Sequence, residues 1–389
     1  MNKADIAPFS VKITDNEIND LRRRLKHTRL PDTLDASGWK YGTDRDFIKR
    51  FLAELENFDW RTIEGEINAQ PQFLMKQKRA DIHFIHMKSG SPRAVPLLLC
   101  HGWPSSFLEM MELGKLLSSP PDSGAEKDVS FDVVIPSLPG FGFSKPKLDG
   151  TWDLCGYSDC LFRLMSGLDY ERFAVHAYDI AASMMSFGAF RFPERIIAYH
   201  TTEPGLPPPF LGDGAAPLTK DEADYVKVQQ AWDKELGAYM PLFRTKPQTA
   251  AYGLADSPAA TAAWILEKWR DWTDPERPLE ECIPLEHLLA QVSLYWFTNS
   301  FNSANRVYLR DEKNRPWLRT ADTKVSVPVG VTLNATQPIE HAPREYVARI
   351  YSDIRYWEQL AAGGHFLACE KPALLAQSIQ KFMNGVLSK

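Results

Sequence analysis

The sequence predicts an α/β fold with a mostly parallel central sheet flanked by helices, a helical insertion, and an N-terminal extension. Two observations predict the sheet: short apolar runs recur along the chain, and helical stretches separate them. Strands buried on both faces of a parallel sheet are apolar throughout, and these runs have that character. The expected strands lie at 82–86, 95–100, 133–135, 173–175, 196–198, 325–332 and 354–359.

The N-terminal region carries helix signals. Thr14 is followed three residues later by Glu17, a capping box that opens a helix. Apolar residues then recur at helical spacing, and a second amphipathic helix is expected over 44–57. We expect residues 1–80 to form an extension wrapped on the main body.

A helical, proline-punctuated segment interrupts the strand pattern. Residues 205–217 contain four prolines and three glycines, which is typical of a linker. We expect residues 206–322 to form a helical lid, inserted between a first core segment at 81–205 and a second at 323–389.

Composition excludes several classes of function. The formal net charge is -5, so no basic excess favours nucleic acid or an anionic membrane surface. No apolar run is long enough for a membrane span, and the first residues lack the apolar region of a signal peptide. Five scattered cysteines indicate reduced thiols, and we expect a cytoplasmic protein. No G-x-G-x-x-G after a strand, P-loop or H-E-x-x-H is present, so we expect no cofactor and no metal.

A candidate nucleophile follows the run at 173–175. The segment reads F-A-V-H-A-Y-D-I-A and places Asp179 between an apolar strand and a helix of small residues. A side chain on such a sharp turn needs small neighbours two positions away, and Ala177 and Ala181 meet that need. A carboxylate there can attack an electrophilic carbon and form an ester. The alternative is that Asp179 only caps the following helix.

Two glycine-containing turns complete a possible site. H-G-W-P at 101–104 directly follows a buried strand, and its backbone N–H groups can stabilise an oxyanion; a plain turn is the alternative. G-G-H-F at 363–366 places His365 on a close-approach loop near the C-terminus. The order of nucleophile, then histidine, favours a catalytic role for His365.

Together these segments resemble the microsomal and fungal epoxide hydrolases of the α/β-hydrolase superfamily, including their N-terminal domain. The resemblance covers nearly the whole chain and implies the α/β-hydrolase fold. The segments that carry it are F-S-V-K-I-T-D-N-E-I-N-D-L-R-R-R-L-K-H-T-R-L-P, H-G-W-P, P-S-L-P-G-F-G-F-S, T-K-P-Q-T-A-A-Y-G-L-A-D-S-P-A, W-I-L-E-K-W, Y-W-F-T-N-S-F-N-S-A-N-R-V-Y and G-G-H-F.

The resemblance implies a role for each matching residue. Asp179 would be the nucleophile, and Tyr239 and Tyr308 would be lid phenols that protonate the epoxide oxygen. His365 would activate the water that hydrolyses the ester. Further residues are expected around them: Trp103 and Ile180 for the oxyanion hole, and His101, Pro104, Tyr178 and Trp296 for the substrate pocket.

The chain departs from the family pattern in two places. The family's G-G-D-W-G is replaced by A-Y-D-I-A, which puts Tyr178 where the family has glycine. The missing Trp after Asp179 also disfavours a dehalogenase, which needs that indole N–H. The family also has a Glu or Asp just upstream of an H-A-P-like segment, where it orients the catalytic histidine. Counting back from His365, this position falls on Pro338 in this chain. Glu340 is the candidate acid if the loop rearranges, and Gln337 is the uncharged alternative.

Three functions are compatible with these residues. The leading one is hydrolysis of a small apolar epoxide to a vicinal diol, in detoxification or secondary metabolism. The second is a repurposed enzyme that isomerises, cyclises or dehydrates a polycyclic natural product. The third is a non-catalytic small-molecule-binding protein. The family also suggests a possible homodimer.

Overall fold

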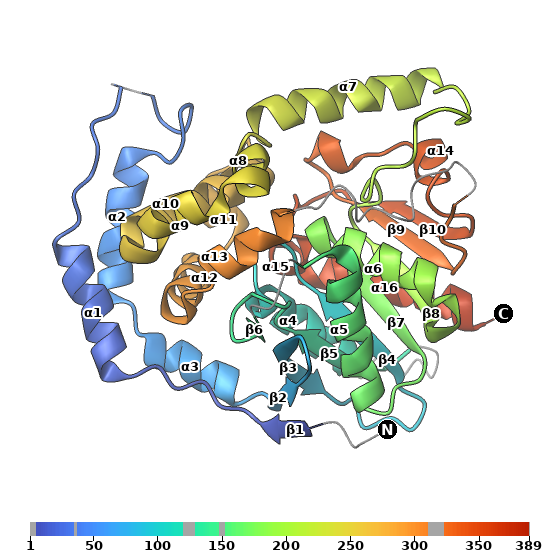
Figure 1. Cartoon of the computed structure of the whole chain (residues 1–389), viewed down its shortest axis with the longest axis horizontal. Coiled ribbons are helices and arrows are strands. Elements are labelled where there is room, and N and C mark those ends of the chain that lie inside the picture. Colours follow the sequence, from blue (N-terminus) through green and yellow to red (C-terminus); the bar gives the residue numbers. More distant parts are fainter. Residues whose placement is uncertain (1–4, 35–36, 120–128, 148–151, 310–322, 389) are drawn as a thin grey trace.

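The computed structural model describes residues 5–34, 37–119, 129–147, 152–309 and 323–388 (Figure 1). Within these residues ten strands form one sheet in the order β1-β2-β3-β5-β4-β7-β8-β9-β10, and β6 pairs with β3. The six strands from β5 to β10 in this order are parallel, which confirms the predicted sheet. The strands are β1 (Asp5–Pro8), β2 (Gln72–Lys76), β3 (Ala80–Met87), β4 (Val95–Cys100), β5 (Phe131–Pro136), β6 (Lys145–Pro146), β7 (Phe173–Ala177), β8 (Ile196–Thr201), β9 (Val329–Leu333) and β10 (Ile354–Gln359).

The N-terminal extension contributes to the sheet as well as covering the body. The Thr14–Glu17 capping box is present, and the buried stripe predicted for the first helix packs inward. Strands β1 and β2 were not expected from the sequence; they pair antiparallel with each other, and β2 pairs with β3. The helices of the extension are α1 (Asp15–Lys26), α2 (Arg45–Asn57) and α3 (Trp60–Asn68).

Helices cover both faces of the sheet and enclose two apolar cores. On one face α16 contacts α4, β8 and β9, and on the other α5 packs against α6. Parallel strands buried in this way are apolar along most of their length, as β4 is. These helices are α4 (Phe107–Ser118), α5 (Leu154–Gly167), α6 (Asp179–Arg191), η1 (Pro193–Arg195), α14 (Arg344–Val347), α15 (Leu367–Glu370) and α16 (Pro372–Leu387).

The lid enters the chain between β8 and β9, which are neighbours in the sheet. Its described part is helical, and its last predicted residues, 310–322, lie outside the described residues. Helices α1 and α2 contact α10, and α2 and α3 contact α12, so the extension holds the lid from the side away from the sheet (Figure 1). The lid contains α7 (Lys220–Glu235), α8 (Tyr239–Thr245), α9 (Pro247–Asp256), α10 (Pro258–Trp272), α11 (Leu279–Cys282), α12 (Leu285–Thr298), α13 (Phe301–Asn305) and η2 (Arg306–Tyr308).

None of the described helices combines the length and apolar character needed to traverse a bilayer.

Candidate active site

Asp179 stands on the turn from β7 into α6. Its φ angle is +51°, in the left-handed region that is rare for residues other than glycine. Strain of this kind is concentrated at functional sites, where surrounding packing maintains it. Gly102 lies directly against the carboxyl group: a Cβ there would be 2.4 Å from the Asp179 Cβ and 2.6 Å from its Oδ1. The turn and the 101–104 loop are therefore built against each other, at the ends of the paired strands β4 and β7.

Two backbone N–H groups already donate to this carboxylate. The N–H of Trp103 donates to Asp179 Oδ1 at 2.7 Å, and the N–H of Ile180 also donates to the carboxyl group. Asp179 begins α6, where the helix dipole favours negative charge. These are the two donors expected for the oxyanion hole, and the structure brings both to the predicted nucleophile.

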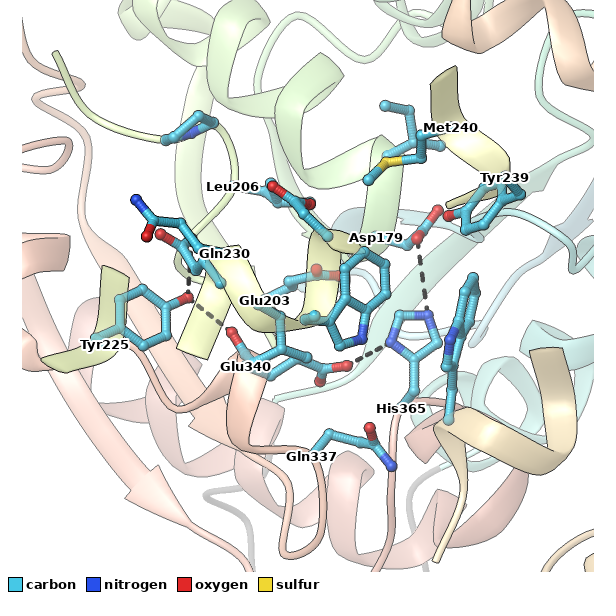
Figure 2. Close-up of a pocket in the computed structure, with 18 of the residues that line it drawn as sticks. Asp179, Glu203, Leu206, Tyr225, Gln230, Tyr239, Met240, Gln337, Glu340 and His365 are labelled. Atoms are coloured by element: carbon cyan, nitrogen blue, oxygen red, sulfur yellow. Dashed lines mark hydrogen bonds and ion pairs between the residues drawn. The ribbon is translucent and has the colours of Figure 1, made fainter. Parts of the chain in front are cut away.

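His365 faces Asp179 across a short gap and has a carboxylate behind it (Figure 2). Its Nε2 lies 3.8 Å from Asp179 Oδ2, and its Nδ1–H donates to Oε1 of Glu340 at 2.5 Å. Asn334 donates to the other oxygen of Glu340, so both oxygens of this buried acid have partners. Gln337 is turned away: its amide donates to the carbonyl oxygens of Thr273 at 2.6 Å and Asp271 at 3.4 Å. Glu340, and not Gln337, meets the second ring nitrogen of His365.

The neighbouring carboxyl groups shift the pKa of His365 strongly. Burial alone would lower the pKa of His365, but the charge and hydrogen bond of Glu340, with the charges of Glu203 and Asp179, raise it to about 10. Burial raises the pKa of Asp179, against His365 and the N–H donors, which lower it. His365 therefore carries a proton at neutral pH, where it faces the Asp179 carboxyl group.

Two lid phenols face each other above Asp179. The hydroxyls of Tyr239 and Tyr308 are 3.2 Å apart. The indole of Trp103 stacks on Tyr239 (centroids 4.8 Å apart, 16° between planes) and meets Tyr308 edge-on. Burial, followed by the Asp179 charge, raises the pKa of Tyr239, so this phenol keeps its proton. Lys268 places its ammonium 5.0 Å from the centre of the Tyr239 ring, opposing the cost of negative charge there.

These groups open onto one cavity of about 380 Å³. Six of the predicted site residues line it: Asp179, Ile180, Tyr239, Tyr308, Glu340 and His365. The wall formed by α7 is partly polar and contains Gln230 and Tyr225 (Figure 2). Gln229, also on α7, donates to the Tyr225 hydroxyl at 3.4 Å. The volume is sufficient for a small organic molecule.

Comparison with known proteins assigns the chain to a family. Residues 6–110 match the model described as epoxide hydrolase N terminus, and residues 95–261 match that of the alpha/beta hydrolase fold. Epoxide hydrolase 1 of Sus scrofa is 32% identical over 99% of this chain and 89% of its own length. The chain belongs to the epoxide hydrolase family.

Solved structures of epoxide hydrolases have the same architecture. The crystal structure of juvenile hormone epoxide hydrolase from the silkworm Bombyx mori superposes with a TM-score of 0.85. It shares 26% identity, covering 99% of this chain and 95% of the other. The structure of Aspergillus niger epoxide hydrolase gives a TM-score of 0.82 at 28% identity, covering 99% and 98% of the two chains. The likeness extends over the extension, the core and the lid of this epoxide hydrolase family member.

Four residues expected in the substrate pocket do not line the cavity of this epoxide hydrolase. Buried His101 accepts the Leu138 N–H at 3.2 Å, and burial lowers its pKa to about 4, so its ring is a neutral structural element. The carbonyl of Pro104 accepts from Trp269. Tyr178 donates to the buried carboxyl of Glu109, behind the His365 ring. Trp296 packs under the Arg24 guanidinium of α1.

Sequence reasoning missed Glu203, which lines the cavity next to Asp179 and His365. It lies two residues after β8, and β8 pairs with β7, which leads into Asp179. Carboxyl ends of parallel strands meet at one edge of a sheet, so an acid directly after the β8 run was a usable signal.

Metal binding at this cluster is geometrically possible. Ligand atoms of Asp179, Glu203 and His365 lie within 4.8 Å of one another. Of these, His365 already donates its Nδ1–H to Glu340 and Asp179 already accepts two backbone N–H groups, as an organic acid–base site requires.

Proposed function

We propose that the enzyme opens an epoxide to a vicinal diol through an ester on Asp179, which water activated by His365 then hydrolyses. The observation that carries this proposal is the single cavity shared by Asp179, the Tyr239–Tyr308 pair and the His365–Glu340 pair. Family membership supports the same reaction, since the relatives compared above are named epoxide hydrolases.

Ring opening uses the lid and the nucleophile turn together. Oδ2 of Asp179 is the oxygen that the Trp103 N–H leaves free, so it attacks an epoxide carbon as the carbon–oxygen bond of the ring breaks. The leaving oxygen takes a proton from the phenol pair, whose hydroxyls converge above the carboxylate. Lys268 stabilises the resulting phenolate of Tyr239 through its ring face.

Ester hydrolysis uses the core residues. Alkylation removes the negative charge of Asp179, one of the charges that hold a proton on His365. The proton that leaves His365 returns to the phenolate, and the neutral His365 is then the base that takes a proton from water. Water oxygen bonds to Cγ of Asp179, and the N–H groups of Trp103 and Ile180 hold the oxyanion until the diol leaves.

The test is a single turnover of a simple aryl epoxide in ¹⁸O-water, with enzyme in excess. The first diol is expected to contain unlabelled oxygen from Asp179, and later turnovers of the same enzyme are expected to introduce label. The Asp179→Asn variant tolerates the left-handed backbone and is expected to form neither ester nor diol. A first diol labelled entirely from solvent would contradict the covalent route.

The second sequence-based alternative, a repurposed isomerase or cyclase, rested partly on a missing acid. The contact between Glu340 and His365 removes that reason, so hydrolysis is preferred. A small apolar or polycyclic epoxide is the proposed substrate, supported by the tryptophan and tyrosine rings in the cavity wall. A cytoplasmic location is proposed because all five cysteines are unpaired. A homodimer stays a prediction.

A further inference from the structure

Glu203 introduces an additional carboxyl group into the catalytic cluster (Figure 2). Its carboxyl group lies with Asp179 and His365 in a cluster whose ligand atoms are all within 4.8 Å of one another. Neither the phenol pair nor the His365–Glu340 pair needs it. Burying a carboxyl oxygen beside a nucleophile costs free energy, because burial disfavours its charge, and such costs are concentrated at functional sites.

Two atoms of this cluster have no partner. Within the described part of the chain, neither Oε2 of Glu203 nor Nε2 of His365 makes a hydrogen bond, although both are buried. Buried polar atoms without a protein partner are places where ordered water binds, since water satisfies two to four such groups at once. Two atoms bridged by a water lie about 4.5 Å apart when both hydrogen bonds have ordinary length and meet at a tetrahedral angle.

We propose that Glu203 and His365 together hold the water that attacks the Asp179 ester. One hydrogen of this water points to Nε2 of His365 and the other to Oε2 of Glu203. These two contacts aim the oxygen at Cγ of Asp179. The inference rests on the proposed function and assigns a further catalytic residue to its second step.

Glu203 acts by accepting a hydrogen bond and takes no proton. Burial, followed by the charge of Glu340, raises the pKa of Glu203 well above its usual range. Its Oε2 has no hydrogen-bond donor among the described residues, so this oxygen is available to accept from the water. The water loses one proton to His365 as its oxygen bonds to Cγ. When the ester bond breaks, the departing diol oxygen takes that proton from His365. The second proton of the water, left on the new carboxyl group of Asp179, then passes to His365, so Asp179 is an anion again and His365 regains its proton.

The anchoring of Glu203 suits this task. The backbone N–H of Asp179 donates to its carboxyl group, and the Glu203 N–H donates to Oγ1 of Thr201 at 3.1 Å. The acid is therefore fixed to the nucleophile turn itself. Because the lid carries the phenols and the core carries Glu203, the two half-reactions depend on different residues.

The experiment separates the two half-reactions in Glu203→Leu and Glu203→Gln. Alkylation is followed as quenching of tryptophan fluorescence, since Trp103 and Trp272 border the site. Ester breakdown is followed as loss of the mass adduct after excess epoxide is removed, in buffer with EDTA. In Glu203→Leu, ester breakdown is expected to be about 100-fold slower, the effect of a misplaced reactant, with alkylation unchanged.

Glu203→Gln keeps a carbonyl acceptor of the same shape and is expected to restore breakdown to within about threefold of wild type, a loss no larger than one neutral hydrogen bond. Glu235→Leu, on the exposed end of α7, is the matched control and should alter neither step. Normal breakdown in Glu203→Leu, equal slowing of both steps, or equal loss in the Gln and Leu variants would overturn the inference alone. Absence of any ester in the wild type would overturn the proposed function, and this inference with it.

Discussion

At the scale of single residues, the site depends on the close contact between Gly102 and the carboxyl group of Asp179. Position 102 requires glycine, because the Asp179 carboxyl occupies the space where a Cβ would be. The same proximity lets the neighbouring Trp103 N–H reach Asp179 Oδ1. One absent methyl group therefore allows the present positions of both the proposed nucleophile and its proposed oxyanion donor.

Gly102→Ala should disable ring opening without unfolding the protein. The Gly102 φ angle is not in the left-handed region, so the backbone accepts alanine, but the new Cβ displaces the Asp179 carboxyl. A displacement of about 1 Å costs on the order of 100-fold in rate, and stopped-flow alkylation measurements would report it. An alkylation rate equal to wild type would show that the carboxyl does not need its present position.

Glu340→Gln should slow the second half-reaction selectively. The variant keeps a hydrogen-bond acceptor near His365 Nδ1 but loses the charge that stabilises the imidazolium. By analogy with the loss of the acid from a catalytic triad, ester breakdown should fall by about 10⁴-fold. Mass spectrometry should find most of the enzyme as the ester, whereas Glu54→Gln on the exposed face of α2 should behave as wild type. Fast breakdown in Glu340→Gln would remove Glu340 from the mechanism.

At the scale of elements, the lid helix α10 supports the phenol carried by α8. Lys268 on α10 is buried and lies over the Tyr239 ring, whose other face stacks on Trp103. Helix packing thus places a positive charge where phenolate character develops. This contact lies outside the His365–Glu340 pair, so it should act on ring opening alone.

Lys268→Met preserves the apolar stem and removes this charge. A cation–π contact contributes about 0.5–2 kcal/mol, so alkylation should slow by about 2- to 30-fold. Ester breakdown should be unchanged, and the exposed Lys234→Met on α7 should affect neither step. Single-turnover kinetics of both variants make the comparison. Equal slowing of both steps would indicate a general loss of lid structure.

Some helices and strands could be predicted from the sequence and others could not, because their sequence signals differ in strength. Buried parallel strands such as β4 are continuous apolar runs, and the Thr14 cap has a fixed spacing, so both were predictable. Strand β2 was not, because this strand near the sheet edge alternates less clearly in burial and carries polar ends. Its structure follows from pairing with β3, the next strand along the chain, and with β1.

The orienting acid shows why counting residues was insufficient. Counting back from His365 gave Pro338, but Pro338–Glu340 forms a 3-10 turn, which carries the chain around so that Glu340 faces the histidine. Trp296 was misplaced for a related reason. Its motif marked the correct helix, α12, but the side chain points to Arg24 of the extension, which the motif does not encode.

At the scale of the whole molecule, the buried ionisable groups set the dependence of stability on pH. The folded-state pKa of His365 is raised to about 10 from an ordinary 6.5, so its contribution is complete below pH 6.5 and is lost as pH rises towards 10. Burial raises the pKa of the Cys100 and Cys160 thiols, which adds to the loss at higher pH.

The urea midpoint should therefore fall between about pH 8 and 10, above the range in which buried histidines of lowered pKa make stability rise with pH. In Glu340→Gln the fall should be shallower, because Glu340 is the main group that raises the pKa of His365. Urea unfolding followed by tryptophan fluorescence at half-unit pH steps would measure both curves. Parallel curves for the two proteins would contradict this assignment of the proton.

The position of the lid in the chain has a consequence for how such an enzyme acquires new substrates. The lid leaves the core after β8 and returns at β9, and these strands are adjacent in the sheet. The segment between them can change in length or sequence while the strand order and the core residues proposed for ester hydrolysis stay as they are. Substrate range and ester hydrolysis are thus separately inheritable, and exchanging this segment between relatives that keep both lid phenols is a direct route to altered selectivity.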